Sequence, residues 1–88
     1  MNNKQILGAL ALDLKRVSLG FHRGSNLMAE KFLGEALKRR DEIDTKTLKP
    51  YLIKLLGNIE NIRKESKQKA AEDALLYSTL FQNASQNC

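Results

Sequence analysis

His22 is the single histidine of this 88-residue sequence and the residue best suited to acid–base or metal chemistry. A catalytic or metal-binding imidazole works with a nucleophile, a carboxylate or further ligands beside it. On a helix, Ser18 and Ser25 fall within reach of His22, at spacings of four and three residues. The pattern contains no group that would activate either serine, so His22 does not predict a catalytic site.

The acidic residues Asp41, Glu42 and Asp44 form a second cluster that could bind a ligand. A calcium loop places oxygen ligands at alternating positions and includes a glycine and a final glutamate, and this spacing is missing here. We interpret the cluster as a turn in which Asp44 caps the following helix. The glycines also lack the spacing of a phosphate-binding loop. We therefore expect no metal ion, no cofactor and no enzymatic activity.

The basic residues are more informative than the acidic ones. Seven basic and two acidic residues in the segment 45–69 give it a charge of +5, which equals the net charge of the chain. On a helix, five of the basic residues would share an arc of about 100°. These candidate contacts to an anionic partner are Lys46, Lys49, Arg63, Lys64 and Lys67. A basic stripe can follow a phosphate backbone, but no aromatic residue lies in it to stack on a base. Nonspecific nucleic-acid binding is therefore our alternative hypothesis.

The chain length and composition predict one small all-α domain over residues 1–88. The sequence is 42% hydrophobic and 28% charged, with one proline, which excludes a disordered chain. A folded monomer of this length buries roughly 64% of the surface of its unfolded chain, so its stability is marginal. No stretch reaches the ~20 apolar residues of a membrane span. The single cysteine, Cys88, suits a reducing compartment, so we expect a cytoplasmic protein with no membrane contact.

The first half of the chain has an apolar stripe with helical spacing. Its members lie within an arc of about 80° on a helix: Ile6, Leu10, Leu14, Val17, Phe21, Met28 and Phe32. Because the stripe keeps its phase past Gly20 and Gly24, we favour one continuous or kinked helix over residues 3–40. The alternative is a helix that ends near Leu19 and a second helix that Ser25 caps. A second apolar patch, formed by Leu12, Leu19 and Leu33, also needs a partner.

The second half has two apolar stripes that differ by one residue in phase. The first follows the spacing of a coiled-coil seam, with Leu48, Leu52, Leu55, Ile59 and Ile62. The second contains Ala70, Ala74, Tyr77 and Phe81. The residues 47–81 therefore form either one helix with a polar middle or two helices that are broken near residues 66–69. We expect order from residue 3 to about residue 82 and a frayed tail over residues 83–88.

These patterns predict a long helical hairpin or a small antiparallel bundle. In a hairpin of residues 3–40 and 47–81, one side of each seam stays open, so two copies would pair into a four-helix bundle. A compact monomer of three or four helices is the alternative. We expect a small non-enzymatic interaction, adaptor or regulatory protein that acts through protein–protein contacts. The predicted core comprises Ile6, Leu10, Leu14, Val17, Phe21, Met28, Phe32, Leu52, Leu55, Ile59, Ile62, Tyr77 and Phe81.

Overall fold

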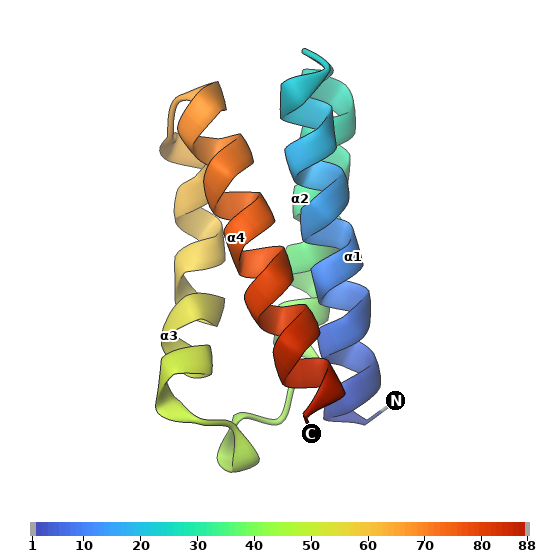
Figure 1. Ribbon diagram of the computed structural model, residues 1–88, viewed down its shortest axis with the longest axis vertical. Coiled ribbons are helices and arrows are strands. Elements are labelled where there is room, and N and C mark those ends of the chain that lie inside the picture. Colours follow the sequence, from blue (N-terminus) through green and yellow to red (C-terminus); the bar gives the residue numbers. More distant parts are fainter. Residues whose placement is uncertain (1, 88) are drawn as a thin grey trace.

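The computed structural model describes residues 2–87 and is all-helical over that range (Figure 1). Its elements in chain order are the helices and 3₁₀ segments α1 (Asn3–His22), α2 (Asn26–Asp41), η1 (Thr45–Thr47), α3 (Pro50–Asn58), η2 (Ile59–Lys64) and α4 (Lys67–Gln86). The helix α1 packs against both α4 and α2. The segments α3 and η2 follow one another along the opposite side of α4 (Figure 1). The all-α prediction is therefore confirmed, and the four α-helices lie within one chain.

The prediction of one continuous helix over residues 3–40 is wrong. The chain turns back after α1, because Gly24 adopts a positive φ of 73° and the Ser25 hydroxyl caps α2 by accepting from the Met28 amide. Gly20 makes this tight reversal feasible. A Cβ atom at position 20 would lie 2.7 Å from the backbone nitrogen of Ala29, so only glycine lets α2 approach this closely.

The second half is also broken, at the place that our alternative proposed. The helix α3 begins at Pro50, a residue that suits the first position of a helix. It tightens into η2, in which Ile59 and Ile62 are buried at the three-residue spacing of a 3₁₀ helix. The Ser66 hydroxyl accepts a hydrogen bond from the Lys69 amide and so caps the start of α4. A single helix over residues 47–81 is therefore wrong, and α4 continues to Gln86, past the expected end near residue 82.

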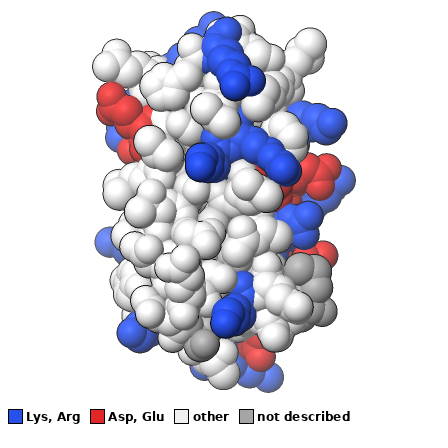
Figure 2. All heavy atoms as spheres, turned by 45° about the vertical axis from the view of Figure 1, so that its right-hand side comes forward, with Lys and Arg blue, Asp and Glu red and all other residues white. Residues whose placement is uncertain are grey.

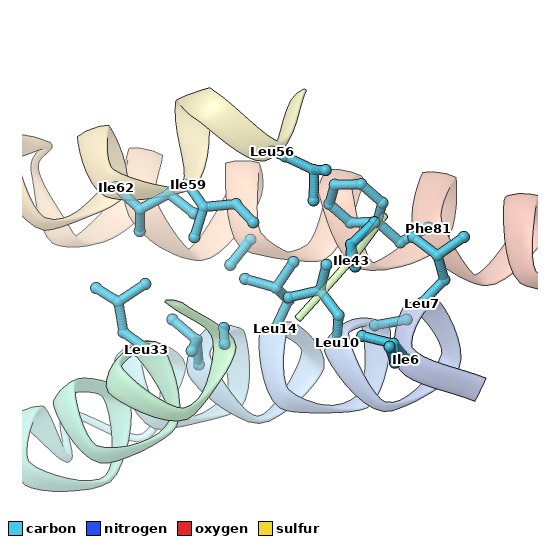
Figure 3. Close-up of a cluster of buried hydrophobic side chains, with 14 of the residues drawn as sticks. Ile6, Leu7, Leu10, Leu14, Leu33, Ile43, Leu56, Ile59, Ile62 and Phe81 are labelled. Atoms are coloured by element: carbon cyan, nitrogen blue, oxygen red, sulfur yellow. The ribbon is translucent and has the colours of Figure 1, made fainter. Parts of the chain in front are cut away.

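The hydrophobic core lies between α1, α2, α4 and the α3–η2 segment. Figure 3 shows Leu7, Leu10 and Leu14 of α1 facing Phe81 of α4, with Leu56 on the other side. Most of the predicted core is buried, but Phe21, Met28, Phe32, Leu55 and Tyr77 are only half-buried. Small or neighbouring residues take over the inner positions: Leu7, Ala11, Ala29, Leu33, Ala36, Ile43, Leu56, Ala70, Ala71 and Ala74.

The contact between α1 and α4 has a regular polar ladder. Three buried or half-buried serine hydroxyls donate to main-chain carbonyls of the opposite helix: Ser18 to Ala71 at 2.8 Å, Ser78 to Ala11 at 2.6 Å and Ser85 to Lys4 at 2.8 Å. The steps are seven residues on each helix, so the two antiparallel helices stay in contact over their whole lengths. Within residues 2–87, no helix is long and apolar enough to cross a bilayer.

Candidate functional site

The residues around His22 do not form a catalytic or metal-binding arrangement with it. His22 is exposed at the last position of α1. Of the two serines within sequence reach, Ser18 is buried and donates its hydroxyl hydrogen to Ala71, while Ser25 caps α2. Both hydroxyls therefore serve the fold. Across the described residues 2–87, no group of three or more His, Cys, Asp or Glu side chains is placed to hold a metal ion.

The acidic cluster is part of a turn that closes the lower end of the bundle. The Asp44 carboxylate accepts from the Lys46 amide at 3.0 Å and so caps η1. The main chain of Asp44 also exchanges two hydrogen bonds with the Asn3 side chain, at 2.8 and 3.0 Å. These bonds tie the loop after α2 to the start of α1. The capping role that we predicted for Asp44 is confirmed, although it caps a 3₁₀ turn before α3.

The five basic candidates do not form one compact patch. Lys46 lies in η1 and Lys49 directly precedes α3, whereas Arg63 and Lys64 end η2 and Lys67 begins α4. Figure 1 shows η1 at the bottom of the α3–η2 segment and the η2–α4 turn at its top. The stripe is therefore split between two ends of the molecule.

The ion pairs of these basic residues also differ. Arg63 contacts Glu30 of α2, with 3.4 Å between Nε and Oε2. Lys46, Lys49, Lys64 and Lys67 lie within ion-pair distance of no carboxylate in the described part of the chain. Four of the five candidates are thus left to interact with solvent or an anion.

A cluster of ionisable groups lies along α4 and the turn before it. Lys69 Nζ lies 3.0 Å from Asp73 Oδ2 and 3.5 Å from Glu65 Oε2. Burial raises the pKa of Glu65, and the neighbouring Asp73 carboxylate raises it further. Burial alone would raise the pKa of Asp73, but its interactions with Glu65 and with the Lys69 ammonium, which donates a hydrogen bond to it, outweigh burial and lower that pKa. Glu65 therefore keeps its proton to a higher pH than an ordinary glutamate. The two ion pairs of Lys69 connect Glu65, which precedes α4, to Asp73 within α4.

The largest stretch of sequence without charged side chains lies in α4, and it forms an uncharged surface together with part of α1. Asp73 is the last residue with a charged side chain, so α4 is uncharged from Ala74 onward, although 28% of the whole chain is charged. We call the outward-facing part of this region the neutral face. It comprises Leu12 of α1 and Leu75, Leu76, Thr79, Gln82, Asn83 and Gln86 of α4.

The neutral face contains three exposed leucine side chains. Leu12, Leu75 and Leu76 are 48%, 46% and 53% exposed. A shallow groove between the helices is lined by Leu12, Lys15 and Leu75, with Ser78 among the other lining residues. Figure 2 looks onto this side and shows a broad area without charged residues, with basic side chains above and below it. Contiguous exposed apolar surface of this kind marks interaction sites.

Sequence reasoning found only the α1 part of this surface. The unpartnered patch of Leu12, Leu19 and Leu33 was visible from helical spacing, and in the structure Leu33 is buried while Leu12 and Leu19 remain exposed. The α4 part was missed, although the lack of charge after Asp73 is a signal that the sequence contains. Cys88 lies outside the described residues. No known family matches this chain, and neither does any curated protein or solved structure.

Proposed function

We propose that this chain is a non-enzymatic helical interaction protein whose contact surface is the neutral face, and that its first partner is a second copy of itself. The carrying observation is the combination of Leu12, Leu75 and Leu76, about half exposed, with an α4 that has no charge after Asp73. Burial of exposed leucines is the main driving force of association between helices in water.

The charge of the chain supports this choice of face. Two copies with a net charge of +5 each repel one another, and this repulsion is weakest where the surface is uncharged. The seams from which we first inferred a dimer are closed within the monomer, so the neutral face takes their place in the argument. A standard interface covers roughly 800 Å² on each partner, about a seventh of the 5386 Å² of accessible surface. The neutral face would form the centre of such an interface, which would extend over neighbouring residues of α1 and α4, two helices of 20 residues that are each about 30 Å long.

Sedimentation equilibrium of the full chain at tens of micromolar tests this function. We expect a dimer for the unchanged protein and a monomer for Leu75→Glu, because the substitution buries two unpaired carboxylates in the interface. Ile53→Glu is the matched control, since Ile53 is 41% exposed but lies on α3. A monomer for the unchanged protein, or a Leu75→Glu variant that still dimerises, would overturn the proposal.

Nonspecific nucleic-acid binding is the second candidate, and the unpaired lysines favour it. Lys64 ends η2 and Lys67 begins α4, and neither lysine has a carboxylate partner among residues 2–87. A salt titration with duplex DNA and with RNA tests it, because each neutralised phosphate steepens the salt dependence. Binding that weakens with salt and is lost in Lys64→Glu/Lys67→Glu would support this function. The absence of binding at low ionic strength removes it.

A further inference from the structure

The geometry of the α1–α4 pair points to one arrangement of the dimer, and this inference rests on the proposed function. We infer that the two copies pair around a two-fold axis that runs parallel to α1 and α4, so that α4 of each copy packs on α1 of the other. The result is a four-helix bundle made from two α1–α4 pairs, in which neighbouring helices are antiparallel.

The serine ladder fixes which residues lie at the same height on the two helices. Ala11 is level with Ser78, and Ser18 is level with Ala71. Lys15 lies between the two on α1, so it is level with the part of α4 between Ala71 and Ser78. Glu72 belongs to this part of α4.

Two unpaired charges of opposite sign therefore lie at nearly the same height: Lys15 is level with Ala74, and Glu72 is two residues, or ~3 Å, away from Ala74 along α4. Lys15 and Glu72 are both exposed, and neither forms an ion pair with any described residue. The nearest polar contact of Glu72 is the Gln68 amide within the same helix, at 3.5 Å. Charged groups at the edge of an apolar interface commonly select the orientation of the partner.

The direction of the two-fold axis decides what these charges meet. An axis parallel to the helices keeps the height of every residue and exchanges α1 with α4, so Glu72 comes opposite the partner's Lys15, twice in each dimer. A two-fold axis perpendicular to the helices, across the middle of the neutral face, would instead place α1 of one copy on α1 of the other. The two copies of α1 would then run in opposite directions, so residues near one end would meet residues near the other end. Lys15 would then meet the end of α1 that holds the partner's Lys4, because Lys4 is level with Ser85 at the far end. Like charges would repel there, so the parallel axis is favoured.

Charge reversal on the full chain tests this arrangement, with the dimer dissociation constant measured by sedimentation equilibrium. Under the parallel axis, Lys15→Glu and Glu72→Lys each raise the dissociation constant about tenfold or more, and the double variant returns it to within about threefold of the unchanged protein. Circular dichroism of each variant confirms that the helices persist.

The outcomes separate this inference from the proposed function. If the unchanged protein dimerises but Lys15→Glu tightens the dimer and Glu72→Lys leaves it unchanged, the axis crosses the helices and the inference is wrong. Dimerisation with no effect of either reversal also overturns the arrangement, while the proposed function stands. If the unchanged protein is a monomer, the proposed function itself fails.

Discussion

The Ser78 hydroxyl donates a hydrogen bond to the main-chain carbonyl of Ala11, with 2.6 Å between the two oxygens. This bond joins residues that are far apart in the sequence and brings α4 against α1 at a position where both side chains are small. It is the middle rung of a ladder that sets the relative height of the two helices. The ladder lies directly beneath the neutral face, so the same contact that stabilises the fold also positions the proposed interface.

Ser78→Ala tests the contribution of this rung to stability. Loss of one buried hydrogen bond should reduce the free energy of unfolding by about 0.5–1.5 kcal/mol. Ser78→Leu should cost more, about 1–3 kcal/mol, because the larger side chain pushes the helices apart. Urea denaturation of dilute protein measures both. Thr79→Ala is the control, since Thr79 is exposed and bonds only within α4. Equal effects at positions 78 and 79 would contradict the ladder.

Gly20→Ala should destabilise the protein, although alanine is the better helix former. The new methyl group would lie 2.7 Å from the backbone nitrogen of Ala29, and backbone atoms cannot move away cheaply. We expect a loss of about 1–3 kcal/mol. Gly34→Ala is the matched control in α2, where a Cβ atom meets nothing within 4 Å, and it should gain about 1 kcal/mol. Thermal denaturation of both variants shows whether their signs differ; a stabilised Gly20→Ala variant would refute the close approach of α2.

Leu56→Ala should cost about 2–5 kcal/mol, because Leu56 is only 4% exposed in the core. Leu55→Ala should cost clearly less, since Leu55 is half-buried at the edge of the core. Chemical denaturation of the two single variants compares these neighbours directly. The reverse order would mean that α3 and η2 present a different side to α1 and α4.

Glu65→Gln should keep or increase stability at neutral pH. The pKa of Glu65 is raised in the folded state above its ordinary value of 4.5. Its contribution to stability is therefore fully present below the unfolded pKa and is lost as the pH rises through the folded pKa. A glutamine mimics the protonated acid, so the variant should be more stable than the unchanged protein at pH 7 and equally stable at pH 3.

Urea denaturation at both pH values measures this difference. Glu35→Gln is the control, because Glu35 lies on α2 and its side chain is 44% exposed beside Lys38. It should change stability by less than about 0.5 kcal/mol at either pH. A Glu65→Gln variant that is equally destabilised at pH 3 and pH 7 would contradict the raised pKa of Glu65 in the folded protein.

The sequence was sufficient to predict the helical class and most of the core, because helical spacing of leucine and isoleucine reports burial directly. It misled at Gly20 and Gly24. The shared phase of Ile6 and Phe32 suggested one helix, whereas the close approach of Ala29 to Gly20 depends on a contact that no local pattern encodes. We predicted Leu55 in the core, but its neighbour Leu56 is buried there instead. The reason is similar: the 3₁₀ segment η2 turns by a different angle per residue than an α-helix, so Leu56 rather than Leu55 lies on the same side as Ile59 and Ile62.

The candidate site was less predictable than the fold. The basic residues shared one side of a helical projection. In the structure, however, Lys46 and Lys49 lie before α3, whereas Lys64 and Lys67 lie at the other end of the α3–η2 segment. The neutral face depends on which sides of α1 and α4 meet. That choice follows from the small residues Ala11 and Ser78, whose role becomes visible only when the two helices are brought together.

A dilution series followed by two-dimensional ¹H–¹⁵N NMR of the full chain tests the central claim most directly, because it reports association residue by residue. We predict that the amide signals of Leu12, Leu75 and Thr79 shift together as the concentration rises to tens of micromolar and above, while those of Ile53 and Lys54 on α3 stay in place. Signals that do not depend on concentration, or shifts confined to α3, would contradict the account.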